Sequence, residues 1–371
     1  MTTSILILGG YGYAGRLLAR HLLAESDAGL VLAGRNAEKA QSLTAQLNAE
    51  FAGDRVAGIR ADAADSESLR RAFCGIDLVL VAATTVQHTE RVARAALEAG
   101  IDYLDIQYSP KRVPVLQSLA DEICRAGRCF ITEAGFHPGL PAAMVRYVAP
   151  HFSHLDTAIV GSVLNPEGGL PSAESVDELI EAFKDYQGQV FKDGRWQTAG
   201  SFDVRAIDFG AEFGRRSCYS MFLEEMRSLP DTYPSLNTTG FYVAGFNWFV
   251  DYLLTPVIML SLKLWPERAV RPMGRLLVWG TQKFASPPYG VLLKIEATGE
   301  KDGKPLKVEA SAFHSDGYEF TAIPVVACLL QYLDGSIKRP GLWMMGHLVD
   351  PARLFGDMER MGITVATKVV H

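Results

Sequence analysis

The chain has 371 residues, more than one hydrophobic core usually fills, so its length predicts at least two domains. Hydrophobic residues make up 48% of it and charged residues 21%, a balance typical of globular proteins and not of disordered ones. The net charge of −6 weighs against a nucleic acid or an anionic membrane as a partner.

Several classes of protein are disfavoured because the sequence signals typical of them are missing. The first residues contain no basic stretch and no cleavage site, so we expect no secretory signal and a cytoplasmic protein. The five cysteines are odd in number and scattered, which predicts reduced thiols and no zinc or other metal site. The motifs of zinc proteases, serine hydrolases and Walker-type ATPases are also missing, which disfavours hydrolases and kinases.

Residues 1–133 alternate between apolar runs and helical patterns. The runs at 5–8, 30–33, 55–60, 77–82, 103–105 and 129–132 predict strands, and the helical patterns lie at 15–24, 37–49, 66–73, 87–99 and 112–126. This alternation, with strands that are apolar throughout, is typical of an α/β fold with a doubly wound parallel sheet of the Rossmann type. Such sheets bind ligands beyond the carboxyl ends of their strands.

The first strand opens into a glycine-rich turn, Gly10-x-Gly12-x-x-Gly15, which leads into a helix. In this pattern the first glycine allows a tight turn, the second lets the backbone approach a pyrophosphate, and the third lets the helix pack on the strand. The start of the helix favours anions. We therefore predict a dinucleotide here, unless the turn binds nothing. The expected contacts are Gly10, Tyr11, Gly12, Tyr13, Ala14 and Gly15.

Arg35 follows Gly15 by 20 residues and ends the second apolar run. Folds specific for NAD usually place an acid near this position to bind the ribose 2′-hydroxyl, and residues 33–37 contain none. An arginine makes charge-assisted hydrogen bonds to a 2′-phosphate, which a carboxylate would repel. We therefore predict NADP(H) as the cofactor, with Arg35 and Asn36 near its 2′-phosphate. The alternative for Arg35 is a solvated charge.

Two further strand ends carry candidate cofactor contacts. Asp62 follows the third strand, where it can reach an adenine amino group or act as a turn or cap acid. Ala82 and Ala83 follow the fourth strand and are small enough to let a cofactor pass close to the backbone. Thr84 and Thr85 come next, either as cofactor contacts or as caps of the following helix.

From residue 135 the pattern predicts an α+β domain on a mixed or antiparallel sheet. We expect helices at 138–150, at 175–186 with Ser172 or Ser175 as its cap, and at 321–333. A strand is expected at 157–163, with hairpins around 190–196 and over 289–314. The predicted domains are an NADP-binding domain at 1–134, a substrate and dimerisation domain at 135–317, and a C-terminal return to the first domain at 318–371.

Residues 246–284 are unusually apolar and then cationic. The apolar part is interrupted by Asp251, Pro256 and Lys263, so it is shorter than the roughly 18–20 residues that cross a membrane. Three interpretations stay open: a buried helix pair or dimer face, a helix on a membrane surface, and an apolar lid over the substrate. The cations that follow are Arg268, Arg271, Arg275 and Lys283.

Several segments together resemble the saccharopine dehydrogenase-like, or saccharopine reductase, family. The resemblance rests on residues 5–15, 32–36, 77–83, 96–105 and 134–140, and extends to 321–324 and 340–351. It implies a Rossmann domain with an inserted α+β domain, and NADP as cofactor. Two features depart from the family. His137 stands where its members have an aspartate before Pro-Gly, and segment 246–284 is closer to divergent relatives linked to lipids, including trans-acting enoyl reductases.

The family also implies candidate catalytic residues, because its hydride acceptor is an imine whose reduction a nearby acid or carboxylate assists. His137 follows the sixth strand and has an ordinary pKa near 6.5. Glu133 is expected to steady an iminium, and Tyr108 to donate a proton beside Asp105 and Gln107 on the same cleft edge. Each residue also has a structural alternative. His137 could belong to a turn or cap a helix, Glu133 could form a salt bridge at the strand end, and Tyr108 could pack in the wall of the cleft.

The sequence thus predicts an NADP(H)-dependent oxidoreductase of the saccharopine reductase type. Its reaction would be hydride transfer to or from a C=N or C–N bond of a small, amino-acid-like substrate. One alternative is an NADPH-dependent enoyl reductase that acts on a C=C bond of a lipid or polyketide intermediate. Another is a non-catalytic, lipid-associated NADP-binding protein. We expect a homodimer with no nucleic-acid partner, and peripheral lipid contact through residues 246–284 stays open.

Overall fold

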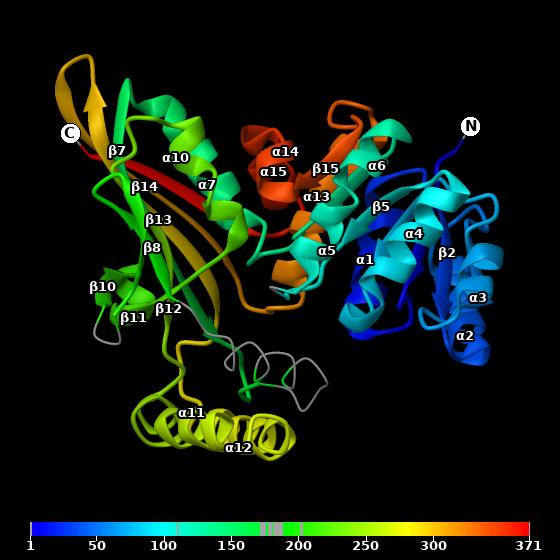
Figure 1. Ribbon diagram of the computed structural model, residues 1–371, viewed down its shortest axis with the longest axis horizontal. Coiled ribbons are helices and arrows are strands. Elements are labelled where there is room, and N and C mark those ends of the chain that lie inside the picture. Colours follow the sequence, from blue (N-terminus) through cyan, green and yellow to red (C-terminus); the bar gives the residue numbers. More distant parts are fainter. Residues whose placement is uncertain are drawn as a thin grey trace. The chain divides into compact units, whose positions relative to one another are not determined.

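The computed structural model describes residues 2–109, 111–170, 176, 180, 188–200 and 203–370. The chain divides into two compact units, shown with their elements in Figure 1. Unit 1 contains Met1–Leu140 and Thr321–Met358, and unit 2 contains Pro141–Phe320 and Glu359–His371.

Unit 1 is built on a seven-stranded sheet in which every pairing is parallel, as the alternation of strands and helices predicts. The strand order is β15-β6-β5-β4-β1-β2-β3. The strands are β1 (Ser4–Leu8), β2 (Gly29–Gly34), β3 (Val56–Arg60), β4 (Leu78–Val81), β5 (Asp102–Asp105), β6 (Cys129–Thr132) and β15 (Gly341–Met344). The order reverses at β1, because the chain places β2 on one side of it and β4 on the other. Ligands of open α/β sheets bind at such a reversal.

The helices of unit 1 follow its strands closely. They are α1 (Tyr13–Glu25), α2 (Ala37–Glu50), α3 (Ser66–Ala72), α4 (Thr89–Ala99), α5 (Arg112–Ser118), α6 (Ala120–Arg125), α13 (Glu319–Leu333), α14 (Met345–Leu348) and α15 (Pro351–Arg360). The single helix expected at 112–126 is instead the pair α5 and α6. It breaks at Leu119, whose N–H bonds to the Leu116 carbonyl, three residues back instead of four (3.0 Å).

Residues from the C-terminal part of the chain complete unit 1. Tyr332, near the end of α13, is fully buried and donates its hydroxyl to Asp102 of β5 at 2.6 Å. Asp102 also accepts the backbone N–H of Cys129, the first residue of β6, at 2.9 Å. A single buried carboxylate therefore joins β5, β6 and α13.

Unit 2 is an α+β unit on a mixed sheet, as predicted. Its main path is β10-β11-β12-β7-β13-β14-β16, where β12 and β7 are parallel and the other neighbours antiparallel. The strands are β7 (His154–Asn165), β8 (Gln189–Lys192), β9 (Arg195–Thr198), β10 (Val204–Asp208), β11 (Arg215–Met221), β12 (Thr238–Ala244), β13 (Gly290–Lys301), β14 (Lys304–His314) and β16 (Thr364–Val370). The sequence did not predict β10, β11 and β12.

The two predicted hairpins are confirmed. Each turns on an aspartate–glycine pair with positive φ at both residues, 52° and 74° at Asp193-Gly194 and 52° and 75° at Asp302-Gly303. These are the angles of a type I′ turn, whose twist matches that of the flanking strands. The first joins β8 to β9 and the second joins β13 to β14.

The end of the chain differs from our expectation that all of 318–371 returns to the first domain. Strand β16 instead pairs along β14 in unit 2, from Phe313 opposite Thr364 to Lys307 opposite Val370. The edge of β14 would otherwise present unpaired N–H and C=O groups, which β16 satisfies.

In the described part of unit 2 the structure has the helices α7 (Leu140–Val148), α9 (Gly210–Phe213), α10 (Leu229–Thr232), α11 (Thr255–Leu264) and α12 (Val270–Lys283). The helix expected at 175–186 lies almost entirely outside the described residues. The apolar segment 246–284 forms a short π-helical turn at Val250–Leu254, then α11 and α12. Figure 1 shows these two helices side by side, and we call residues 246–284 the α11–α12 hairpin.

Candidate cofactor and active site

The turn between β1 and α1 is packed too tightly to accept side chains at two of its glycines. Gly9 has a φ of 90°, and a Cβ atom there would lie 2.8 Å from the Cβ and backbone nitrogen of Ala83. A Cβ atom on Gly15 would overlap the Gly9 carbonyl oxygen. The turn after β1 therefore touches the segment after β4, at the point where the sheet order reverses. Sequence reasoning missed Gly9, although the Gly9-Gly10 doublet marks a strained turn.

Gly12 is in a different position in the same turn. Its φ of −67° suits any residue, it is exposed, and a Cβ atom there would meet only the Gly9 carbonyl oxygen, at 3.1 Å. It caps α1, whose first turn contains no acidic residue. The N–H groups of Ala14 and Gly15 precede the first intrahelical hydrogen bond, from Arg16 to Gly12 (3.0 Å). The open side of Gly12 and these N–H groups fit a pyrophosphate.

The end of β2 is joined to this turn by Tyr11. The Tyr11 ring lies against Gly34, where any side chain would collide with it. Its hydroxyl accepts the backbone N–H of Asn36 at 3.0 Å. The Asn36 side chain accepts the N–H of Lys39 (2.9 Å) and so caps α2, a structural use that we did not predict. Arg35 is exposed and has no ion-pair or hydrogen-bond partner among the described residues, which leaves its guanidinium available to a phosphate.

A structural role explains Asp62 in part, but helix capping does not explain Thr85 after β4. The carboxylate of Asp62 accepts the N–H of Ala64 at 3.0 Å. At least one of its oxygens therefore has a role in the local turn, which was the alternative to an adenine contact. Thr85 precedes the short 3₁₀ helix at Val86–His88 without a side-chain capping hydrogen bond, and its hydroxyl bonds to the Ala83 carbonyl at 3.3 Å. Thr84 is exposed beside it. Capping therefore does not explain Thr85.

The segment after β5 is tied to the segment after β4. Gln107 is buried and donates its side-chain amide to the Ala83 carbonyl and to the Thr85 hydroxyl, the latter at 3.3 Å. Tyr108 follows directly and is half-buried. Gln107 therefore places the adjacent Tyr108 near the ends of β4 and β5.

Asp105, by contrast, does not face the cleft. It is completely buried, and so is Arg112, whose Nη1 lies 2.8 Å from an Asp105 oxygen. The hydroxyl of Thr132 donates to the other oxygen at 3.0 Å, and the N–H of Glu133 donates to the same carboxylate. Burial raises the pKa of Asp105, and Arg112 opposes that rise. No local pattern indicates this pair, because Arg112 stands in an ordinary helical pattern.

This buried pair supports the loop that follows β6. Glu133 is buried and has a φ of 55°, a left-handed conformation that residues other than glycine rarely adopt. The loop then curls back on itself, so that a Cβ atom on Gly139 would lie 2.8 Å from the Glu133 carbonyl oxygen. Strained backbone of this kind gathers at functional sites when the surroundings hold it in place.

His137 lies in the same loop, but its protonation differs from what we assumed. Burial lowers the pKa of His137 to about 4. The side chain is therefore neutral at pH 7 and does not offer an imidazolium proton. Its selection on the ordinary histidine pKa was wrong in that respect, since the desolvation around Phe136 and Pro138 is not visible in the sequence.

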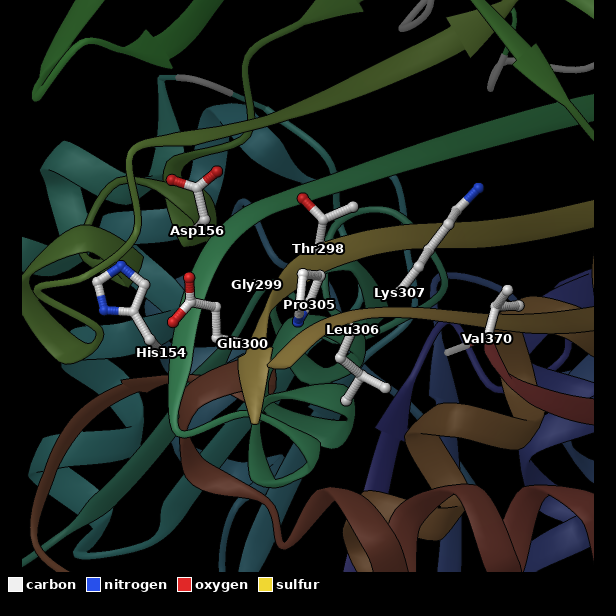
Figure 2. Close-up of a pocket in the computed structure, with 9 residues that line it drawn as sticks. All are labelled: His154, Asp156, Thr298, Gly299, Glu300, Pro305, Leu306, Lys307 and Val370. Carbon is white, nitrogen blue, oxygen red and sulfur yellow. The ribbon is translucent and has the colours of Figure 1, made fainter. Parts of the chain in front are cut away.

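Unit 2 contains a pocket with none of the predicted site residues. Figure 2 shows it at one end of β7, β13 and β14, beside Val370 of β16. Its lining residues are His154, Asp156, Thr298, Gly299, Glu300, Pro305, Leu306, Lys307 and Val370. Within the described ranges, no three histidine, cysteine or acidic side chains are grouped to hold a metal.

Comparisons with known proteins agree with this geometry. Residues 5–131 match the family model described as "Saccharopine dehydrogenase NADP binding domain". These residues belong to that domain family. The NADP-binding domain therefore takes NADP(H), and it contains the glycine turn, Arg35 and the ends of β1 to β6.

Two proteins show the wider likeness. Carboxyaminopropylagmatine dehydrogenase from Synechocystis sp. is 26% identical over 257 residues, which cover 66% of this chain and 63% of that protein. The matched part thus spans less than two thirds of that relative. The apo structure of saccharopine dehydrogenase (L-Glu forming) from Saccharomyces cerevisiae superimposes with a TM-score of 0.70 at 16% identity, over 100% of both chains. This second likeness shows a shared fold.

The two glycines of the turn should separate cofactor binding from folding. We expect Gly12→Val to abolish binding of both NADPH and NADH, because the side chain occupies the pyrophosphate position, with little change in the melting temperature. Gly15→Ala should lower the melting temperature, since its Cβ overlaps the Gly9 carbonyl. Titration calorimetry and thermal unfolding measure the two effects. Unchanged affinity in Gly12→Val would show that this turn does not hold the phosphates.

His137 should make the protein sensitive to acid. Its folded pKa is about 4 and its ordinary value about 6.5, so between these values the unfolded chain binds the proton more readily. Stability is therefore full above pH 6.5 and falls as the pH drops toward 4. We expect His137→Gln to reduce this fall in thermal unfolding scans, whereas His151→Gln leaves it unchanged. Identical pH profiles for wild type and His137→Gln would contradict the lowered pKa.

Proposed function

We propose that the chain is an NADP(H)-dependent oxidoreductase that transfers a hydride to or from a C=N or C–N bond of a small, amino-acid-like substrate. The observation that supports NADP(H) is Arg35 at the end of β2, which is exposed and has no partner in the described part of the chain. An acid at this position would instead favour NAD(H). Bound NADP(H) supplies or accepts the hydride. The residues of the chain must hold the reactants and manage the charge that changes on nitrogen.

Glu133 is suited to that second task. An imine accepts a hydride at carbon more readily when its nitrogen carries a proton, and a nearby carboxylate stabilises the resulting iminium. Glu133 directly follows β6, and its backbone N–H donates to the buried Asp105 carboxylate. We assign Tyr108 the transfer of a proton to or from that nitrogen. His137, neutral at pH 7, serves in this scheme as a polar wall of the site.

The relatives support an amine substrate by name. One is called carboxyaminopropylagmatine dehydrogenase and the other saccharopine dehydrogenase (L-Glu forming). The first shares 26% of its aligned residues with this chain, and the second shares the fold. Homodimer formation and a cytoplasmic location stay predictions of the sequence.

The α11–α12 hairpin favours a second candidate, an NADPH-dependent enoyl reductase acting on a C=C bond of a lipid or polyketide intermediate. Large apolar side chains are exposed along α11, and such a surface suits an apolar substrate or its carrier. The cofactor and the NADP-binding domain are the same in both proposals, so the acceptor bond alone separates them.

Arg35 provides the test of cofactor choice. We expect Arg35→Ala to weaken NADPH binding by about ten- to a hundredfold, because one or two charge-assisted hydrogen bonds to the 2′-phosphate are lost. NADH binding should change little. The matched control is Arg125→Ala, an exposed arginine on α6 of the same unit. Equal losses for NADPH and NADH in titration calorimetry would remove Arg35 from this role.

A substrate screen provides the test of the reaction. Purified protein with NADPH is offered mixtures of α-keto acids or aldehydes with amino acids and, separately, enoyl thioesters, while NADPH absorbance is followed. We expect turnover with an imine-forming mixture, and a loss of kcat of at least tenfold in Glu133→Gln with unchanged NADPH affinity. Exposed Glu98→Gln is the control. Turnover on enoyl thioesters alone would select the second candidate, and cofactor binding without any turnover would contradict both.

A further inference from the structure

The α11–α12 hairpin contains most of the exposed large hydrophobic residues of the described chain. Nine of the fourteen exposed large hydrophobic residues of the described chain lie between residues 248 and 279. Trp248 is 62% exposed, Leu260 58% and Trp265 58%. The nine are Trp248, Tyr252, Leu253, Val257, Met259, Leu260, Leu264, Trp265 and Trp279. Large apolar side chains that gather on the surface of a folded protein mark interaction sites.

Helical spacing shows that this exposure is a second apolar face. The buried residues of this stretch recur every four positions, at Val250, Leu254, Ile258 and Leu262, and pack in a cluster with Val270 and Leu277 of α12. The exposed residues at 253, 257, 260 and 264 also follow helical spacing and form a separate stripe. A helix that is apolar on most sides is normally covered, so the second stripe is suited to an apolar environment.

The charges of the hairpin differ in sign from those of the chain. The hairpin contains five cations and two acids, so the other residues hold a net charge of −9. The cations are Lys263, Arg268, Arg271, Arg275 and Lys283; all are exposed, and none has an ion-pair partner among the described residues. One of the acids, Asp251, accepts the backbone N–H of Phe246 at 2.9 Å and is not exposed.

The exposed apolar residues and the excess of positive charge together favour one kind of binding partner for this face. A second copy of the chain would bring two faces of net charge +3 together, which is unfavourable. An anionic lipid surface offers an apolar layer for the leucine stripe and phosphate-bearing headgroups for the cations. Tryptophan and tyrosine, with an apolar body and a polar tip, suit the boundary between the two. None of the helices in the described ranges is long and apolar enough to span a membrane.

We propose that the outer face of the α11–α12 hairpin binds the surface of an anionic lipid bilayer. The hairpin lies in the interface, with Leu253, Val257, Leu260 and Leu264 among the acyl chains and Arg271 and Arg275 at the headgroups. This contact is independent of the proposed reaction, because it needs neither the cofactor nor a substrate.

Vesicle co-sedimentation tests the proposal with the full chain and no cofactor. Vesicles of phosphatidylcholine alone are compared with vesicles in which about 30% of the lipid is phosphatidylglycerol, which makes their surface anionic. We expect at least tenfold more protein on the anionic vesicles, less binding at high salt, and a blue shift of tryptophan emission. Three of the five tryptophans of the chain, Trp248, Trp265 and Trp279, are exposed residues of the hairpin.

Matched variants separate the apolar and the charged contributions. The double variant Leu260→Asp, Leu264→Asp should lose at least tenfold of its vesicle binding, and Val204→Asp, which changes an exposed apolar residue of β10, should lose none. Arg271→Glu with Arg275→Glu should abolish the preference for anionic vesicles, whereas Arg195→Glu at the β8–β9 turn should not. Thermal unfolding checks that each variant is folded.

Two outcomes would overturn the proposal. One is equal, low sedimentation with both vesicle types. The other is a concentration-dependent dimer in light scattering that Leu260→Asp with Leu264→Asp dissociates, without vesicle binding by the wild type. In that second case the face is covered by another copy of the chain. Neither outcome bears on NADPH binding or turnover, which are measured separately.

Discussion

The backbone of the turn after β1 lies against the backbone of the segment after β4, with space for a hydrogen atom and not for a methyl group at Gly9. This close approach fixes where α1 begins and leaves its first N–H groups at the point where the sheet order reverses. Tyr11 carries the same constraint to the end of β2 through Gly34 and Asn36. The positions available for a pyrophosphate and for a 2′-phosphate therefore follow from one packing requirement.

A second constraint is electrostatic and lies deeper in unit 1. Two fully buried charges are costly to remove from water, and an ion pair of this kind seldom adds net stability compared with apolar residues of the same volume. The Asp105–Arg112 pair is better understood by what it holds. Its carboxylate receives hydrogen bonds from Thr132 and from the backbone of Glu133, so it links the end of β5 to the end of β6. That support is what allows Glu133 to keep a left-handed backbone conformation.

The sequence was sufficient for the features that depend on local patterns. Strand and helix alternation, the glycine spacing and the two aspartate–glycine turns are each encoded within a few residues, and all were predicted. Features that depend on distant contacts were not. The pairing of β16 with β14 joins residues more than 50 positions apart, and the burial of Arg112 and His137 depends on neighbours that no local pattern specifies. Asp105 was placed on a cleft edge and His137 was selected on its ordinary pKa, whereas burial decides how both of them behave.

Net charge is also a weak guide to the partner of a single face, because it averages over regions that act separately. A value of −6 argues against an anionic surface only if the charge is spread evenly, and interactions between exposed charges fade over roughly 8–10 Å in physiological salt. A cationic hairpin within an otherwise acidic chain experiences attraction at its own face, while the remaining surface is repelled. The acidic remainder would then orient the molecule instead of preventing contact. The same imbalance disfavours self-association through the exposed residues 253, 257, 260 and 264, since the arginines that would attract a lipid headgroup repel an identical copy.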